Sequence, residues 1–202
     1  MTDRSAPRRI GEVVEATSTS FVAQCYTLYD APPLGSLVRA GDPPLHGVVY
    51  RVATEPLDAT RPVLARGESA ATEEEVFRDN PQLERLLTSR FEVLILGHQA
   101  QGVDLPVLPP LPPRVHAFVY TSDADDVARF AGGAGWLRTL LSSNIPAADQ
   151  VLAACLRGAA SAVSASGVSD GDALLLDSCK ALAGELAGDL PRLNAILRMV
   201  RQ

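Results

Sequence analysis

The stretch Leu45–Thr54 reads LHGVVYRVAT and carries the strongest β-strand pattern of the chain. Valine, tyrosine and threonine, which suit the pleated, half-buried surface of a sheet, make up half of it. Just before it, Gly41–Pro44 (GDPP) is a predicted turn and Ser36–Arg39 a shorter predicted strand. Because such a short link joins antiparallel neighbours, the two strands are predicted to form a hairpin.

Further predicted strands lie on both sides of this hairpin. Arg9–Ala16 and Phe21–Leu28 precede it, joined by a turn at Thr17–Ser20, and Phe91–His98 and Val115–Tyr120 follow it. Apolar residues occur on both faces of Phe21–Leu28, as expected for a barrel strand that also has a neighbour outside. About six short strands separated by proline and glycine turns predict a small β-barrel.

Two segments interrupt these strands. Residues 72–88 are predicted to be a helical insertion, in which Thr72 and Glu75 form a capping box and Asn80 begins a second helical turn with Pro81 at its first position. The proline-rich segment, residues 105–114, is predicted to be extended because proline cannot donate a hydrogen bond to a central sheet. It is interpreted as a rigid rim or linker, and its PxxP spacing leaves open a role as a ligand for another domain.

The composition changes after Ser122, where apolar residues begin to recur at helical spacing. The predicted helices are a short one with Val127 and Phe130, one near Trp136, and longer ones at Ala147–Ser166, at Asp170–Ala187 and after Pro191. Their apolar stripes are expected to pack against one another or against a partner. The predicted fold class is α+β: a small N-terminal β-barrel, residues 8–122, followed by a C-terminal α-helical bundle, residues 123–202.

Charge, hydropathy and cysteine content exclude several classes of protein. The 202 residues carry a net charge of −6, which argues against non-specific affinity for nucleic acid or anionic membrane as the main role. No apolar run is long enough for a membrane span, and the N-terminal MTDRSAPRRI lacks the apolar core of a secretory signal. Cys25, Cys155 and Cys179 are widely spaced and predict free thiols, so a cytoplasmic protein is expected.

No catalytic, cofactor or metal residue is predicted. The single lysine, Lys180, has no glycine loop before it, so the chain lacks a nucleotide-binding P-loop. Gly132–Gly135 (GGAG) lacks the third glycine of the dinucleotide fingerprint. The three histidines lie far apart in strand-like runs and are interpreted as half-buried, hydrogen-bonded residues rather than zinc ligands; they are His46, His98 and His116.

Two acidic clusters receive structural explanations. Glu73, Glu74 and Glu75 follow the capping residue Thr72, at the positive end of a predicted helix. Asp123, Asp125 and Asp126 could bind magnesium in a nuclease, but Ser122 with Asp125 is interpreted as a second capping box.

The first ~120 residues resemble a known family. Three segments show the resemblance: Arg9–Val14 (RIGEVV), Ala31–Gly41 (APPLGSLVRAG) with Gly35 and Val38, and the strand with Gly47, Val48 and Val49. This part of the chain is similar to the HAS barrel, which is shared by HerA-type DNA-translocating ATPases and rotary ATP synthase subunits. Arg66–Leu83 resembles standalone bacterial members of this group, which lack the ATPase core. In the family the barrel packs against sister barrels in a ring and has no active site of its own.

The resemblance implies a non-catalytic assembly or adaptor protein. Its partner would be a HerA-type ATPase, the nuclease associated with such an ATPase, or a further copy of this chain, with nucleic acid contacted only indirectly. The alanine-rich helices add the expectation of a homodimer.

An alternative hypothesis is a barrel that binds single-stranded nucleic acid or a small ligand, with aromatics stacking on bases. The candidate aromatics are Phe21, Tyr26, Tyr29 and Tyr50, and the candidate cations are Arg39, Arg51, Arg61 and Arg66.

Overall fold

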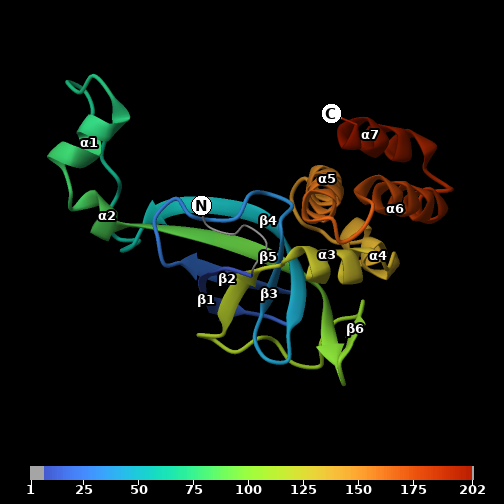
Figure 1. Cartoon of the computed structure of the whole chain (residues 1–202). Coiled ribbons are helices and arrows are strands. Elements are labelled where there is room, and N and C mark those ends of the chain that lie inside the picture. The colour runs from blue at the N-terminus through green and yellow to red at the C-terminus, as the bar shows by residue number, and fades with distance from the viewer. Residues whose placement is uncertain (1–6, 202) are drawn as a thin grey trace.

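The computed structural model describes residues 7–201. Within them, a seven-stranded antiparallel sheet and seven helices make a mixed α+β protein (Figure 1). The strands are β1 (Arg9–Ala16), β2 (Ser20–Cys25), β3 (Leu37–Ala40), β4 (Leu45–Pro56), β5 (Leu87–Ala100), β6 (Val103–Leu105) and β7 (Phe118–Thr121). The helices are α1 (Glu73–Asp79), α2 (Leu83–Leu86), α3 (Ala124–Ala131), α4 (Gly135–Leu141), α5 (Ala148–Ser166), α6 (Gly171–Glu185) and α7 (Leu190–Val200).

The strand order is β2-β1-β7-β3-β4-β5-β6, and β2 also pairs with β5. Six strands are therefore hydrogen-bonded in a ring, and β6 extends it as a short flap beyond β5. The predicted hairpin is confirmed: β3 pairs with β4, with Val38 opposite Gly47 and Arg39 opposite His46. β7 lies between β1 and β3, so a strand from late in this region joins two early ones.

One hydrophobic cluster draws on all six strands of the ring. Phe21, Ala23 and Cys25 alternate along β2 and are buried in this cluster, as the alternation of side chains along a strand requires. The other strands contribute Ile10, Val13, Val38, Ala40, Val49, Phe91, Val93, Ile95 and Val119. The residues between Phe21, Ala23 and Cys25 are half-buried, which agrees with the apolar character of both faces of β2.

A second cluster joins the sheet to the helices. Val48 of β4 and Leu94 and Leu96 of β5 pack with the apolar stripes of the helices from α3 to α7, around the fully buried Trp136. The helices thus cover one end of the β4–β5 pair (Figure 1). Gly35, with φ of 83°, permits the close approach of α5, because a Cβ there would lie 2.6 Å from the Cβ of Ala154.

The ends of two early strands differ from the prediction. β3 lies one residue later than the predicted Ser36–Arg39. The predicted strand Phe21–Leu28 ends at Cys25, because the chain bends from Tyr26 into a turn at Leu28 and Tyr29, where the φ of Tyr29 is 62°. Such a left-handed conformation does not occur in a regular strand.

Later strands show larger differences. β7 begins at Phe118 and not at Val115, because His116 is left-handed with φ of 68°. β5 is longer than the predicted Phe91–His98. β6 was not predicted; it follows a two-residue turn at Gln101 and Gly102, which both have positive φ as hairpin turns require.

The helices occupy the predicted regions, with two corrections at their starts. Pro81 does not begin a helix: α2 is a single turn starting at Leu83, and Leu87 already belongs to β5. The cap of α3 is Asp123 and not Ser122, because the Asp123 carboxylate accepts a hydrogen bond from the Asp126 backbone N–H at 2.7 Å. The Thr72 cap of α1 is confirmed, since its side chain accepts from the backbone N–H of Glu75.

Candidate functional site

Three features of the molecule could carry a function, and the first is an arm formed by residues 57–86. The arm connects the ends of β4 and β5 and contains α1 and α2; it projects at the end of these strands opposite to α5–α7 (Figure 1). None of its residues is buried. At its base, the Leu57 backbone N–H donates to the Leu86 carbonyl oxygen at 2.8 Å, directly beyond the Pro56–Leu87 strand pair.

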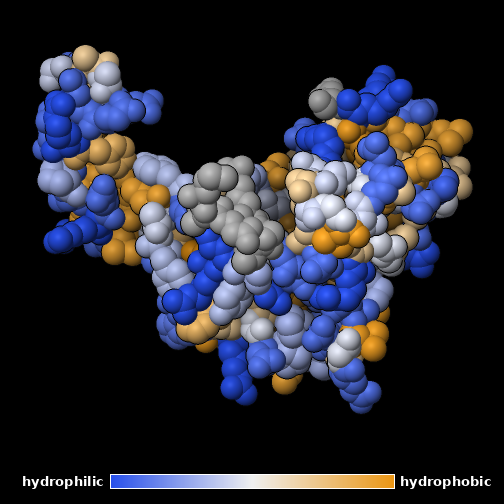
Figure 2. Space-filling model, in the orientation of Figure 1, coloured by the Kyte–Doolittle hydropathy of each residue, from blue (hydrophilic) through white to orange (hydrophobic). Residues whose placement is uncertain are grey.

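The arm exposes apolar side chains near its base. Leu57, Val63, Leu64 and Leu86 are each between 42% and 66% exposed. Together with neighbouring residues of the segment 56–66 and of α2 they line a cavity of about 290 Å³. Figure 2 shows hydrophobic surface over this part of the arm. The arm also carries seven carboxylates and four arginines, so its net charge is −3.

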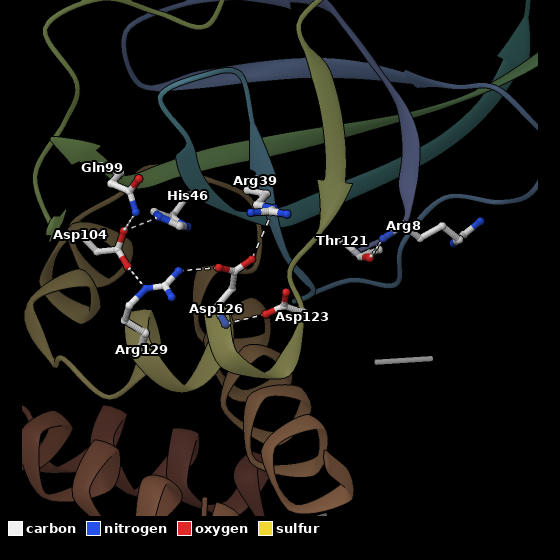
Figure 3. Close-up of polar contacts among 9 residues, drawn as sticks. All are labelled: Arg8, Arg39, His46, Gln99, Asp104, Thr121, Asp123, Asp126 and Arg129. Carbon is white, nitrogen blue, oxygen red and sulfur yellow. Dashed lines mark hydrogen bonds and ion pairs between the residues drawn. The ribbon is translucent and has the colours of Figure 1, made fainter. Parts of the chain in front are cut away.

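The second feature is a network of charged groups between α3 and the sheet (Figure 3). Asp104 of β6 accepts hydrogen bonds from Arg129 of α3 and from Gln99 of β5, at 2.5 and 3.2 Å, and its carboxylate lies 3.0 Å from Nε2 of His46. Arg129 also donates to Asp126 of α3.

Arg39 of β3 completes this network. Its Nε forms an ion pair at 3.4 Å with Asp126, whose side chain is 7% exposed. The imidazole of His46 stacks on the ring of Phe130, with ring centres 4.7 Å apart. The network therefore ties β3, β4, β5 and β6 to α3.

The charged groups of this network hold α3 against the sheet through ion pairs and hydrogen bonds. Burial raises the pKa of Asp104, but hydrogen bonds from Arg129 and His46 outweigh it and hold that pKa below its ordinary value. Asp104 is therefore ionised at neutral pH and unsuited to act as a general acid. Hydrogen bonds from Asp104 likewise raise the pKa of Arg129.

The acidic clusters do not converge on a metal. Asp123 caps α3, Asp126 is paired with Arg39 and Arg129, and Asp125 is exposed. The three glutamates of α1 lie in its exposed first turn on the arm. Across residues 7–201, no group of three or more histidine, cysteine, aspartate or glutamate side chains could hold a metal ion.

The histidines are separate, and each has a hydrogen-bond partner. His46 is buried against Asp104, and half-buried His98 pairs through Nδ1 with the Val107 carbonyl oxygen at 3.0 Å. The expectation of a half-buried residue is confirmed for His98 but not for His46, which is fully buried, nor for His116, whose side chain is 77% exposed beside Glu12. It lies in the turn before β7 and not in a strand.

The cysteines are free thiols, as predicted. Cys25 and Cys155 are buried, and burial raises the pKa of Cys25 to about 11 and that of Cys155 to about 12. Cys179 is half-buried, and burial raises its pKa as well. Because the thiolate is the reactive form, these three thiols are poor nucleophiles at neutral pH.

The segment Gly167–Gly171 (GVSDG) has the GxSxG spacing of a serine nucleophile. It lies in the turn between α5 and α6, where Asp170 caps α6 and Ser169 is exposed. A nucleophile elbow requires a strand before the serine and a helix after it. The segment is therefore a helix–helix turn.

The proline-rich segment does not present a PxxP motif. Its proline pairs at that spacing are Pro106 with Pro109, Pro109 with Pro112, and Pro110 with Pro113. Pro109 and Pro113 are buried, so each pair contains a proline that the protein itself covers. The structure favours the rigid rim, because a domain that binds polyproline contacts both prolines of a pair.

The aromatics and arginines proposed from the sequence are mostly scattered. Phe21 is buried in the inner cluster, Tyr50 donates a hydrogen bond to Glu92 at 2.6 Å, and Tyr29 packs edge-on against Phe77 of the arm. Arg51 also pairs with Glu92, while Arg61 and Arg66 lie on the arm. The two other candidates, Tyr26 and Arg39, each lie beside a further arginine or aromatic side chain of the sheet.

The third feature is a row of alternating arginine and aromatic side chains on the outer face of the sheet. Tyr120 of β7 lies opposite Arg9 of β1 and opposite Arg39 of β3. The Arg9 guanidinium carbon lies 4.7 Å from the ring centre of Phe118 and 5.5 Å from that of Tyr26, and Arg39 lies 5.6 Å from that of Tyr120. We call these five residues the cation–aromatic row.

A groove of about 830 Å³ borders the row, and both Phe118 and Tyr120 line it. Its walls are the β3–β4 turn at residues 41–45, the end of β5 and the segment 109–117, which includes Arg114. The proline-rich segment therefore forms one rim of this groove. The sequence did not reveal the row, because its members come from strands whose pairing is not local.

Comparison of the chain with models of protein families, and with proteins of curated function, found no match. No helix in the described part of the chain is long and apolar enough to cross a membrane.

Proposed function

We propose that this chain is a non-catalytic assembly or adaptor protein that docks through its arm. Its partner is a ring-forming ATPase of the HerA type, or the nuclease associated with one, and self-association is the second mode of assembly. The observation that carries the proposal is the arm: some thirty residues, 57–86, that form two helices and bury no side chain.

Two further observations support the proposal. The ring of pairings closed by β2 and β5, with one cluster drawing on all six strands, is what a small barrel followed by helices requires. Gly35 and Gly47, which belong to the resemblance with the HAS barrel, both lie where a Cβ would meet another element within 2.6 Å.

The arm has the composition of a docking element. Short isolated helices are marginal in water, and most helical stability comes from packing of an apolar face. Here the exposed apolar residues at the base, including Leu64 and Leu86, would gain burial only against a partner. The net charge of −3 on the arm favours a partner surface with basic residues.

Deletion of the arm tests the proposal. Replacing residues 58–85 with Asn-Gly joins Leu57 and Leu86, which already pair, through a two-residue hairpin turn. We expect a thermal midpoint close to that of the full chain, because no residue of the arm is fully buried and a shorter loop costs less entropy to close. In affinity capture from native lysate at low salt, the full chain is expected to recover an ATPase carrying a P-loop, and the deleted chain to lose it.

Point variants sharpen this test. Leu64→Asp, on the arm, is expected to reduce recovery, whereas Leu111→Asp is the matched control, because Leu111 is 74% exposed but lies in the proline-rich segment. Equal recovery by the full and arm-deleted chains would overturn the role of the arm. ATP turnover by the purified chain that disappears on substitution of one carboxylate would contradict a non-catalytic function.

A further inference from the structure

The cation–aromatic row offers exposed rings beside Arg9, which has no salt bridge within residues 7–201. Tyr26 is 51% exposed and Phe118 is 45% exposed. Within residues 7–201, the guanidinium of Arg9 has no hydrogen-bond acceptor or ion-pair partner, and its close neighbours are the two rings. Arg114, on the groove wall, likewise has no salt bridge in the described part of the chain. Unpaired arginines next to open aromatic faces are suited to a ligand that is both planar and anionic.

The local charge of this face differs from that of the whole chain. The row and the groove contain Arg9, Arg39 and Arg114 and one carboxylate, Asp42. A second carboxylate, Glu12, lies opposite Phe118 in the β1–β7 pair and is hydrogen-bonded to His116. Arg39 is already paired with Asp126, so Arg9 and Arg114 are the groups available to an anion. The net charge of −6 is therefore concentrated elsewhere, including on the arm.

The groove has room for such a ligand. Its volume of about 830 Å³ is in the range of sites for small molecules and cofactors. Phe118 contacts Arg9 on the row and also lines the groove, so a flat group in the groove can stack on its ring. Gln99 at the end of β5 and Gln101 in the turn after it also line the groove.

We propose that the row and groove bind a nucleobase together with its phosphate. The base stacks on Phe118 in the groove, and the phosphate pairs with Arg9 and Arg114, which supply charge and planar donors. This inference goes beyond the adaptor function and does not depend on the arm. The same chemistry is presented by a free mononucleotide and by single-stranded nucleic acid.

Two binding measurements on the full chain separate these sources. Fluorescence anisotropy follows labelled oligothymidylate and oligoadenylate of about twelve nucleotides, a length within the site size of single-strand-binding barrels. Calorimetric titration with AMP and UMP tests the mononucleotide. Binding of the oligonucleotides that weakens steeply with salt identifies single strands as the ligand, whereas binding of AMP or UMP alone identifies a nucleotide site.

Substitutions in the row test its part in binding. Phe118→Ala is expected to weaken binding about 5- to 100-fold, the effect of one lost stacking contact. Arg9→Ala is expected to weaken oligonucleotide binding and to reduce the slope of log K against log salt by about 1. Arg9→Lys is expected to keep the original slope of log K against log salt, because lysine keeps the charge. It is expected to restore affinity only in part, because lysine lacks the planar guanidinium that stacks on the aromatic rings.

Matched controls lie outside the row and do not line the groove. Tyr29→Ala removes an aromatic that is 62% exposed, and Arg66→Ala removes an exposed arginine on the arm. Both are expected to bind as the unsubstituted chain does. The proposal is overturned if the chain binds neither oligonucleotide nor mononucleotide at about 50 mM salt, where electrostatic binding is strong, or if Phe118→Ala and Arg9→Ala bind as tightly as the controls.

Discussion

Replacing Trp136 with alanine is expected to lower the free energy of unfolding by about 3–5 kcal/mol, the usual cost of removing a fully buried large aromatic side chain. Trp136 is 0% exposed and lies in the cluster that joins α3–α7 to Val48, Leu94 and Leu96 of the sheet. In a domain of this size, that loss corresponds to a fall in thermal midpoint on the order of 10 °C. Urea and thermal unfolding followed by far-UV circular dichroism measure it.

The control is Trp136→Phe, which keeps an aromatic ring at the site and is expected to cost much less. Trp136 is the single tryptophan of the chain, so its fluorescence reports on this one cluster. In the unsubstituted protein, fluorescence and circular dichroism should give the same unfolding midpoint, because sheet and helices share the cluster. A near-normal midpoint for Trp136→Ala would contradict its place in the shared core.

Replacing Asp104 with alanine is expected to destabilise the protein by about 2–3 kcal/mol, because it removes an acceptor of charged hydrogen bonds and leaves their donors uncompensated. The side chain of Asp104 is 7% exposed, but Arg129 is 50% exposed and can turn toward water, which keeps the cost below that of a fully buried pair. Asp125→Ala removes an exposed aspartate on the same helix as Arg129 and should change stability little.

The Asp104 contribution should depend on pH with a definite sign. The pKa of Asp104 in the folded protein is lowered, so its stabilisation is present above the pKa of an unfolded aspartate, about 4, and is lost as the pH falls through the folded value. The difference in stability between the unsubstituted chain and Asp104→Ala should therefore be full at neutral pH and shrink below about pH 4. A difference that stays constant into acid would show that the charge of Asp104 is not the cause.

Local patterns predicted much of the strand and helix positions. The alternation of Phe21, Ala23 and Cys25 placed them on one buried face, and the Thr72–Glu75 spacing placed the start of α1. These features depend on residues within one turn or one strand. The predicted start of α3 was wrong because both Ser122 and Asp123 can cap a helix, and the sequence does not say which of them has the extended backbone. The predicted start of α2 was wrong because that helix begins at Leu83 without a side-chain cap.

The pairing of distant segments could not be predicted. Arg9 and Arg39 meet Tyr120 only because β7 inserts between β1 and β3, and no local signal specifies that order. The contact between Asp104 and Arg129 likewise follows from the packing of α3 on the short strand β6, which the sequence did not reveal. The aromatics chosen from the sequence alone therefore included Phe21, which is buried, and omitted Phe118.

The arm, the charged network and the row with its groove have different roles in the molecule. The charged network around Asp104 holds the helices to the sheet, the row and groove beside β7 form the proposed ligand site, and the arm projects from the end of β4 and β5 opposite to α5–α7. Arg39 belongs to both the network and the row, so changes in these two features should be coupled. The arm shares no residue with either, so a change in the arm should leave both intact.

Hydrogen exchange of the arm, free and in the complex captured from lysate, tests the central claim most directly. Amides of α1 and α2 should exchange rapidly in the free chain, because neither helix buries a residue. In the complex, the account predicts that amides of residues 57–86 become protected while those of the ring strands change little. Arm amides that exchange equally fast in both states, with new protection elsewhere on the chain, would contradict docking through the arm.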